Sequence, residues 1–388
     1  MKPASAIYRG MGTTVFEATS RLAAERGAVN LGQGFPDDRG PEAVLRAASE
    51  ALLAGGNQYP PMMGLPALRQ AIAAHEARFY GLELDWATET LVTSGATEAL
   101  AACLLGLLEP GDEAVLLQPA YDAYAPLVRR AGATPRFVSL RPPDFLLDAR
   151  ELERAFGPRT KLVVLNNPLN PAGRVFTEAE LDGLARLVEA FDAYAVCDEV
   201  YEHLVFEGRR HVPFIGRPGM RRRALKIGSA GKTFSLTGWK VGMVVGAPEL
   251  LQPVSRAHQF LTFTTPPNLQ TAVALGLGQP DGYFEGLAAE LRRRRDRLAG
   301  GMRALGLEIV PCEGTYFLNL DVRSTGFDGD DVAFCRKLIE DVGVAAIPVS
   351  AFYEEAPVRH LARFCFVKQD AVLDLALERL RAHFGPRA

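Results

Sequence analysis

KLVVL at residues 161–165, followed at once by NNPLNP at 166–171, is the stretch that decides the fold. Similar short apolar runs lie at 89–93, 113–117, 193–197, 224–227 and 241–245. Such runs, β-branched in part and mostly bounded by Gly, Pro, Asn or Asp, are typical of strands buried on both faces of a parallel sheet. Helix-sized stretches separate them, and the one at 177–191 starts with a capping-box pattern, TEAE. The alternation predicts a doubly wound α/β unit between about 42 and 278.

The pattern changes after Pro280. A long helix is expected at 283–305, and its basic run RRRRDR at 292–297 is expected to be a solvated face. Strand-like segments at 315–320, 344–347 and 362–367, with helices at 330–342 and at the end, predict a compact α+β lobe. We therefore expect an N-terminal segment, 1–40, packed on a small C-terminal domain, 283–388, and a large α/β domain, 41–282. A chain of 388 residues also exceeds what one hydrophobic core usually organises.

Composition excludes several classes of function. A net charge of −3 argues against a dedicated nucleic-acid binder. No apolar run approaches the ~18 residues that cross a bilayer, and no apolar signal stretch stands near the N-terminus, so we expect a cytoplasmic protein without membrane partners. The five cysteines form no CxxC and are expected to be reduced core thiols.

Polar groups follow three of the predicted strands. Asn166 and Asn170 follow the run at 161–165, Asp198 and Tyr201 follow 193–197, and a glycine-flanked lysine, Lys232, follows 224–227. Ligands of open α/β sheets gather at the carboxyl ends of the strands, so these groups should face one crevice.

Lys232 is the most informative of these residues. The chain has seven lysines and 36 arginines, so Arg is used wherever a bare positive charge suffices. An amine that bonds to an aldehyde cannot be replaced by Arg, because a guanidinium stays protonated and is not nucleophilic. Lys232 is therefore a candidate for a Schiff base, although a surface lysine in a glycine loop is an open alternative.

TSGATEAL at 93–100 predicts a strand, a turn of small residues and the start of an apolar helix, an arrangement that can bind a phosphate. Two other phosphate motifs fail on spacing. A nucleotide P-loop ending at GKT (231–233) needs glycine at 226, where Lys226 stands, and a dinucleotide fingerprint starting at Gly32 meets Asp37 in place of its third glycine. The six histidines form no HExxH or comparable metal motif, so no metal is expected.

Taken together, the motifs resemble the class I aminotransferases, fold-type-I enzymes that depend on pyridoxal 5′-phosphate (PLP). They are SGATEA at 94–99, NNPLNP at 166–171, DEVYE at 198–202, and SAGK at 229–232 followed by GWKVG at 238–242. The resemblance runs from about Thr13 to the C-terminus and includes NLGQGFP at 30–36 and RFCFVK at 363–368. Within the family the chain is most similar to the subgroup of kynurenine/glutamine aminotransferases, bacterial methionine aminotransferases and some enzymes assigned to succinyl-diaminopimelate.

The resemblance implies a role for each cofactor residue. Lys232 would bond to the PLP aldehyde and then act as general acid and base. Asp198 would pair with the pyridine nitrogen and keep it protonated. Tyr201 and Asn170 would hydrogen-bond the phenolic oxygen, and Tyr121 would stack on the ring. The phosphate would be bound by Gly95, Ala96 and Thr97 through their backbone, and by Ser229 and Lys240.

For the substrate, the resemblance implies a bidentate clamp on the α-carboxylate by Arg363, helped by Asn170 and the backbone of Gly34. It also implies a homodimer in which Tyr59 reaches the neighbouring subunit's phosphate and Phe263 edges the neighbour's pocket. The wall of that pocket would be apolar and aromatic, made by Phe16, Tyr59, Phe263 and Tyr316.

Such a wall favours methionine-, glutamine- or aromatic-type amino donors. Kynurenine-type relatives carry His where this chain has Thr264, which disfavours kynurenine as the main substrate. We therefore expect an aminotransferase that moves the α-amino group of such a donor to a 2-oxo acid. N-succinyldiaminopimelate aminotransferase and cysteine-S-conjugate β-lyase are the alternatives, and a non-catalytic binding module is a more distant one.

Overall fold

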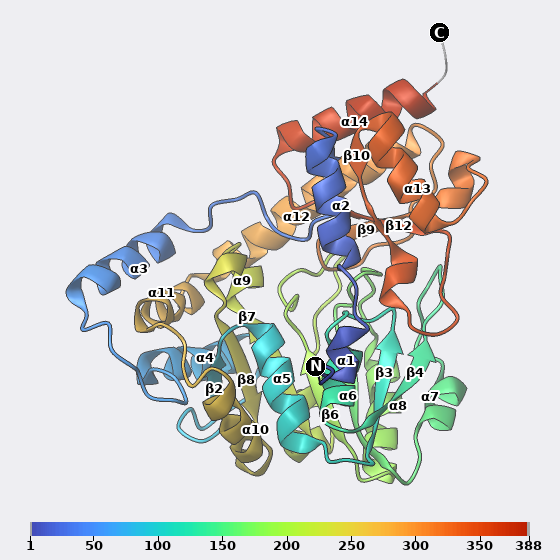
Figure 1. The fold of residues 1–388 in the computed structure, drawn as a ribbon. Helices are drawn as coiled ribbons and strands as arrows, with labels where there is room; N and C mark the ends of the chain where they lie inside the picture. Colours follow the sequence, from blue (N-terminus) through green and yellow to red (C-terminus); the bar gives the residue numbers. More distant parts are fainter. Residues whose placement is uncertain (1, 386–388) are drawn as a thin grey trace.

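A mixed seven-stranded sheet with helices on both faces forms the larger part of the computed structural model, which describes residues 2–385 (Figure 1). The strand order is β2-β8-β7-β6-β5-β3-β4. The bounds are β2 Thr90–Thr93, β3 Glu113–Gln118, β4 Thr134–Ser139, β5 Thr160–Asn166, β6 Tyr194–Asp198, β7 Ala224–Ser229 and β8 Gly242–Gly246. All strands run parallel except β8, which is antiparallel to both neighbours. The expected α/β sheet is confirmed, with β4 added and the run at 241–245 reversed in direction.

Each central strand is buried on both sides, as its apolar run predicts. In β5, Leu162 and Val164 share a core with α5 (Ala96–Leu107), α6 (Tyr124–Arg130) and α10 (Pro248–Leu261). Val163 and Leu165 share another with α7 (Ala149–Ala155) and α8 (Glu178–Ala190), whose capping box at Thr177 is present. A third core joins β2 and β8 to α3 (Glu42–Ala54), α4 (Pro66–Tyr80) and α11 (Pro267–Leu277). The helical layers therefore leave the strand ends as the open edge of the sheet.

A smaller antiparallel sheet is made by β11 (Ile347–Pro348), β12 (Leu361–Cys365) and β9 (Phe317–Asp321), while β1 (Val29–Asn30) pairs in parallel with β10 (Val344–Ala345). The remaining helices are α1 Ala6–Arg9, α2 Val15–Glu25, α9 Ala230–Thr233, α12 Asp281–Arg303, α13 Asp331–Lys337 and α14 Asp370–Phe384. Short 3-10 turns span Phe214–Gly216, Met220–Arg222, Thr237–Trp239, Val322–Thr325 and Val349–Phe352, and a π-turn spans Leu338–Val342.

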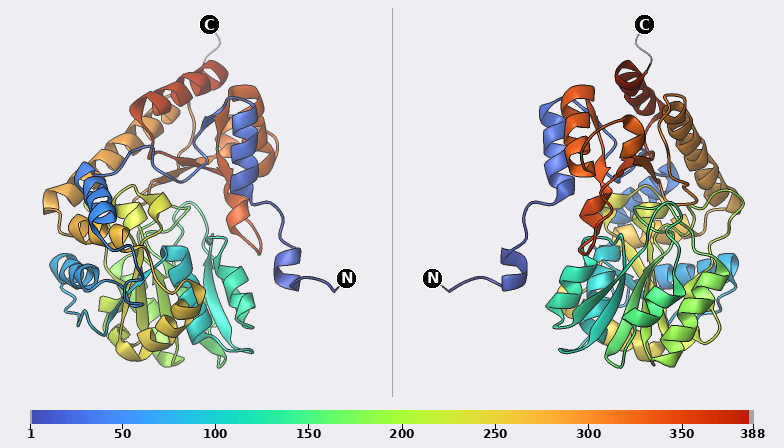
Figure 2. Two further views of the ribbon diagram at one scale, coloured as in Figure 1. Left: turned by 60° about the vertical axis from the view of Figure 1, so that its left-hand side comes forward. Right: turned by 90° about the vertical axis from the view of Figure 1, so that its right-hand side faces the viewer.

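The N-terminal segment lies partly against the small sheet and partly away from the body. Helix α2 contacts β10 and β11, whereas the chain before it, with α1, projects outward (Figure 2). The domain boundaries after residues 40 and 282 stay predictions. Within residues 2–385, every helix is too short or too polar to cross a bilayer.

The basic run at 292–297 is only in part the solvated face that the sequence predicts, because Arg292, Arg293 and Arg297 are exposed and two other arginines are not. Arg294 and Arg295 are both buried on α12. Arg294 donates to Asp38 at 2.8 Å, and Arg295 pairs with Glu207. These carboxylates come from segments far along the chain, so the local charge pattern gave no sign that the two guanidinium groups would be buried.

A second buried cluster of charged side chains lies between β7 and α4. Lys226 on β7 donates to Glu76 of α4 and, at 2.6 Å, to Glu202. The Nε2 atoms of His75 and His203 lie 2.8 Å apart beside them, and burial is the main cause that lowers the pKa of His75 to about 3 and that of His203 to about 4. Sequence motifs gave no metal site, yet one ligand atom each from His75, Glu202 and His203 lie within 4.8 Å of one another. Glu202 is already bonded to the Lys226 ammonium, so the cluster is an ion-pair network.

Lys226→Met is expected to lower the free energy of unfolding by about 3–5 kcal/mol, because it leaves two buried carboxylates without their cation. Burial already raises the pKa of Glu76 to about 7 in the native chain, and loss of Lys226 raises that pKa further. A carboxyl whose pKa is raised on folding loses stability as pH rises, so the loss should grow above pH ~7. Urea unfolding at pH 6 and pH 8 measures it. Lys161→Met is the control, since Lys161 only lies over the Tyr194 ring; an equal loss in both variants contradicts the prediction.

Candidate active site

The ends of three adjacent parallel strands form the floor of the site. Asn166 at the end of β5 is opposite Asp198 at the end of β6, and Asp198 is opposite Ile227 on β7. The Asn166 amide donates to the Asp198 carbonyl at 2.8 Å and accepts the N–H of Asn170 at 2.8 Å. The register therefore brings together the groups that the sequence placed after each strand.

One cavity of about 430 Å³ opens above this floor. Predicted residues that line it are Phe16, Gly34, Gly95, Ala96, Thr97, Tyr121, Asn170, Asp198, Tyr201, Ser229, Lys232, Lys240 and Arg363. Asn166, which the sequence placed after β5, also lines it, as do residues that the sequence did not single out, among them Gln33, Asp122, Tyr124 and Phe317. A single concave site thus holds all of the predicted cofactor and substrate residues except Tyr59, Phe263 and Tyr316.

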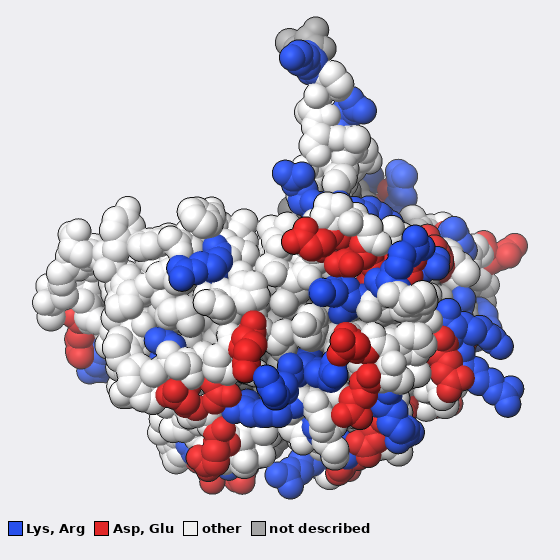
Figure 3. Space-filling model, turned by 90° about the horizontal axis from the view of Figure 1, so that it is seen from below, with Lys and Arg blue, Asp and Glu red and all other residues white. Residues whose placement is uncertain are grey.

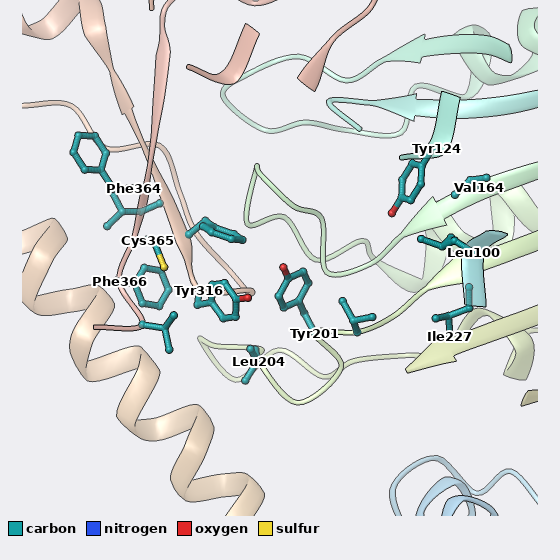
Figure 4. Packing of buried hydrophobic residues seen from close by; sticks show 14 of the residues in the cluster. Leu100, Tyr124, Val164, Tyr201, Leu204, Ile227, Tyr316, Phe364, Cys365 and Phe366 are labelled. Carbon is teal, nitrogen blue, oxygen red and sulfur yellow. The ribbon is translucent and has the colours of Figure 1, made fainter. Parts of the chain in front are cut away.

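The amine of Lys232 faces two phenols. Lys232 lies on α9, directly after β7, and its Nζ donates to the Tyr316 hydroxyl at 2.7 Å, while that hydroxyl donates to the Gly34 carbonyl at 2.8 Å. Tyr201 packs edge-on against Tyr316, with ring centroids 5.2 Å apart, although the two come from different parts of the chain (Figure 4). Tyr316 is thus more than part of an apolar wall, because it holds the lysine amine in place.

Asp198 presents one satisfied and one unsatisfied oxygen. Its Oδ2 accepts from the Tyr124 hydroxyl at 2.5 Å, whereas Oδ1 is buried and has no hydrogen-bond partner among residues 2–385. Burial raises the pKa of Asp198, and the Tyr124 bond opposes that rise. A buried acceptor without a donor is costly, so Oδ1 fits a ligand that brings an N–H. A protonated pyridine nitrogen is such a donor.

The turn before α5 has room for an anion only because its residues are small. Gly95 has φ +84°, and a Cβ on it would lie 3.1–3.4 Å from the Lys240 side chain and backbone. A Cβ on Gly242 would lie 2.6 Å from Gly95 and 2.9 Å from the Ala96 nitrogen. The N–H groups of Ala96 and Thr97 are in the first helical turn, where no carbonyl four residues earlier within α5 can accept from them. Donors and space therefore match the phosphate of PLP.

Arg363 is 2% exposed and lies between aromatic rings. Its Cζ is 3.9 Å from the centroid of Phe317 and 5.3 Å from that of Phe16. Nη1 donates to Asn170 Oδ1 at 3.1 Å and Nη2 to the Gly32 carbonyl at 2.9 Å, while Nε has no partner. Burial lowers the pKa of Arg363 to about 10. The guanidinium is therefore positioned by Asn170 and the Gly32 carbonyl and is only partly satisfied.

Within the part of the chain that the structure describes, Tyr59 and Phe263, unlike Tyr316, neither line the cavity nor hydrogen-bond a residue that does. They lie together on the outside of the chain, 83% and 39% exposed, with ring centroids 5.6 Å apart. Side-by-side exposed aromatic rings are unusual on a monomer's surface. Of the residues missed by sequence reasoning, Tyr124 had the clearest signal, because it stands three positions after Tyr121 in the sequence and begins α6.

The family described as Aminotransferase class I and II matches residues 26–380. A probable N-succinyldiaminopimelate aminotransferase, DapC, of Mycobacterium tuberculosis is 47% identical over 383 residues, 96% of either chain. A methionine aminotransferase of Escherichia coli is 39% identical over 371 residues, again 96% of either chain. A solved N-succinyldiaminopimelate aminotransferase from M. tuberculosis has a TM-score of 0.95 at 48% identity, covering 98% of this chain and 100% of that one. The chain therefore belongs to the class I and II aminotransferases, enzymes of fold type I whose cofactor is PLP.

Proposed function

We propose that the cavity carries out amino transfer between N-succinyldiaminopimelate and a 2-oxo acid, with methionine as the second candidate donor. The observation that carries the chemistry is the unpartnered Asp198 Oδ1, buried in the same cavity as Lys232 and Arg363. The substrate rests on the 47% identical relative, whose name matches the alternative that the sequence left open. The aromatic side chains around Arg363 and the 39% identical relative support methionine.

Each residue has a part in this reaction. When bound, PLP supplies an aldehyde that reacts with amino groups and a ring that takes up an electron pair. Lys232 would hold the aldehyde carbon until the amino group of the donor takes its place, and the freed Nζ, oriented by the Tyr316 hydroxyl, would then move the proton of the substrate α-carbon. Asp198 Oδ1 accepts the ring N–H and keeps that nitrogen protonated.

The other side chains bind and orient. Tyr201 and Asn170 donate to the phenolic oxygen, and Tyr121 covers one face of the ring. Ala96 and Thr97 N–H groups, with Ser229 and Lys240, bind the phosphate, where charge-assisted hydrogen bonds of ~1.5–3 kcal/mol outweigh the helix dipole's ~0.3–1. Arg363 binds the substrate carboxylate on its unsatisfied edge.

A comparison of kcat/KM tests the substrate. N-succinyl-L,L-diaminopimelate, methionine, glutamine, kynurenine and a cysteine S-conjugate are each assayed with 2-oxoglutarate. The proposal expects N-succinyldiaminopimelate to have the largest value. A larger value for methionine favours the second candidate, and pyruvate release from the S-conjugate without a 2-oxo acid would instead support β-lyase chemistry. No turnover of any amino acid would contradict the proposed function.

Arg363→Lys is expected to lower kcat/KM by about 10- to 150-fold, mostly through KM. The ammonium keeps the charge but replaces a planar fork by a single point donor, and a charge-assisted hydrogen bond contributes about 1.5–3 kcal/mol. Steady-state kinetics with the best donor measures it. PLP affinity is the internal control and should stay unchanged; an unchanged KM would rule out Arg363 as the clamp.

We further propose a homodimer that shares its active sites. Tyr59 and Phe263 are exposed together outside their own cavity. Figure 3 shows that the part of the surface to the left of the projecting segment carries few charged side chains, as suits an interface. In this arrangement Tyr59 donates to the phosphate in the second copy's cavity.

Tyr59→Phe is expected to weaken PLP binding by about 2- to 12-fold, the equivalent of one hydrogen bond of ~0.5–1.5 kcal/mol. Tyr59 does not line the cavity of its own chain, so the proposal expects this loss to come from the cavity of the second copy. Fluorescence titration of PLP measures the affinity, and sedimentation velocity checks that the variant keeps the wild-type oligomeric state. An unchanged affinity in an intact dimer would contradict shared sites.

A further inference from the structure

His258 is a fully buried histidine, 0% exposed, on α10 behind the phosphate-binding turn. Its Nδ1 lies 3.0 and 3.1 Å from the two oxygens of Glu98 and 3.3 Å from the Thr262 hydroxyl. Its Nε2 lies 3.3 Å from the carbonyl oxygen of Met62. Both ring nitrogens thus face oxygens that accept hydrogen bonds, and an imidazolium, which donates from both nitrogens, satisfies both contacts.

Glu98 is the residue whose negative charge His258 balances. It stands in the first turn of α5, and its Oε2 accepts the N–H of Ser94 at 3.0 Å. A carboxylate there stabilises the helix start and the turn. The Glu98 carboxylate also lies at the same end of α5 as the N–H groups of Ala96 and Thr97, which are proposed to bind the phosphate dianion. Its negative charge repels that dianion.

The same cluster joins three separate segments. Met62 belongs to the stretch that carries Tyr59. The Ser94 hydroxyl lies 3.3 Å from that of Thr265, in the loop that carries Phe263. Gln270 then donates to the Thr265 carbonyl at 2.6 Å and accepts the N–H of Leu65 at 2.7 Å. The two segments that carry the exposed aromatic rings are thus linked to the start of α5 through hydrogen bonds.

We propose that His258 is a positioning residue whose buried positive charge neutralises Glu98, so that a carboxylate can brace the phosphate-binding turn without repelling the phosphate. The proposal rests on the proposed function, because it assigns the turn to the PLP phosphate. His258 touches neither the cofactor nor the substrate, and its effect is carried by the charge on Glu98.

The charge left behind the turn in each variant predicts the direction in which PLP affinity changes. His258→Gln leaves the Glu98 carboxylate unbalanced behind the turn and is expected to raise the PLP dissociation constant about tenfold, whereas Glu98→Gln removes that negative charge and is expected not to raise it. The double variant has no net charge and is expected to return to within about threefold of wild type. A purely structural pair would weaken binding in every variant.

Pyridoxal, which lacks the phosphate, is the second probe. Its dissociation constant should change less than about twofold in all three variants, since no dianion is bound. His211→Gln is the matched control, because His211 is also a buried histidine bonded to a glutamate, Glu199, at 2.8 Å. It should reproduce any general loss of thermal stability without a change in the ratio of PLP to pyridoxal affinity.

Several results would overturn the proposal. They are equal weakening of PLP and pyridoxal in His258→Gln, a double variant as weak as His258→Gln, or weaker PLP binding in Glu98→Gln. If His258→Gln does not fold, the direction of the change in PLP affinity in Glu98→Gln still tests the proposal. The titrations need no turnover, so a wild-type chain that binds PLP yet transfers no amino group would refute the proposed function and leave this inference standing.

Discussion

Lys232→Ala is expected to lower kcat for amino transfer by about 10²- to 10⁴-fold, the largest effect of any single substitution in the cavity. The variant loses both the amine that holds the cofactor aldehyde and the base that moves the α-proton. The phosphate donors at the start of α5 are untouched, so PLP should still bind, although more weakly. Single-turnover kinetics with the best amino donor, with PLP content measured in parallel, checks both statements.

The control for this variant is Tyr316→Phe. It removes the hydroxyl that accepts from Lys232 Nζ but keeps the ring that packs on Tyr201. Its expected loss is about 2- to 12-fold, since one neutral hydrogen bond is worth ~0.5–1.5 kcal/mol. Turnover in Lys232→Ala near the wild-type rate would refute the assignment of the reacting amine.

Asp198→Asn is expected to lower kcat by about 10- to 10³-fold. Because the Tyr124 hydroxyl donates to one oxygen, the new amide should keep its carbonyl there and turn its NH₂ toward the cavity. A donor then faces the ring nitrogen where an acceptor is needed. An opposite charge in contact shifts a pKa by ~1–3 units. Loss of the carboxylate should therefore lower the protonated share of the ring nitrogen by about 10- to 10³-fold.

Tyr124→Phe separates this effect from simple repacking. It frees Oδ2 but leaves the carboxylate, so its loss of kcat should be well below that of Asp198→Asn. Steady-state kinetics of both variants, with PLP affinity measured by titration, makes the comparison. Equal rates for Asp198→Asn and wild type would show that the carboxylate does not control the ring nitrogen.

The floor of the site could be predicted because it depends on local sequence. Residues that directly follow neighbouring parallel strands must lie at one edge of the sheet, and Asn166 and Asp198 are opposite each other in the register. The resemblance added the roles of Tyr121 and Arg363, which no spacing rule gives. Both lie in the cavity, Arg363 through the pairing of β12 with β9.

The features that the sequence did not predict depend on contacts between segments far apart in the chain. Phe317 reaches Arg363 only because β9 and β12 pair, and the burial of Arg294 required Asp38, more than 250 residues away. Tyr59 and Phe263 meet on the surface although they lie far apart in the sequence. Periodicity and composition carry no information about such pairs.

The account depends most on the identity of the reacting amine. Reduction of the cofactor-loaded protein with borohydride fixes the cofactor to the nitrogen that holds it, and peptide sequencing after digestion locates the label. We expect the labelled peptide to contain Lys232 and no other modified residue. A label on Lys240, Lys226 or any other lysine, or no label at all, would contradict the assignment of the site.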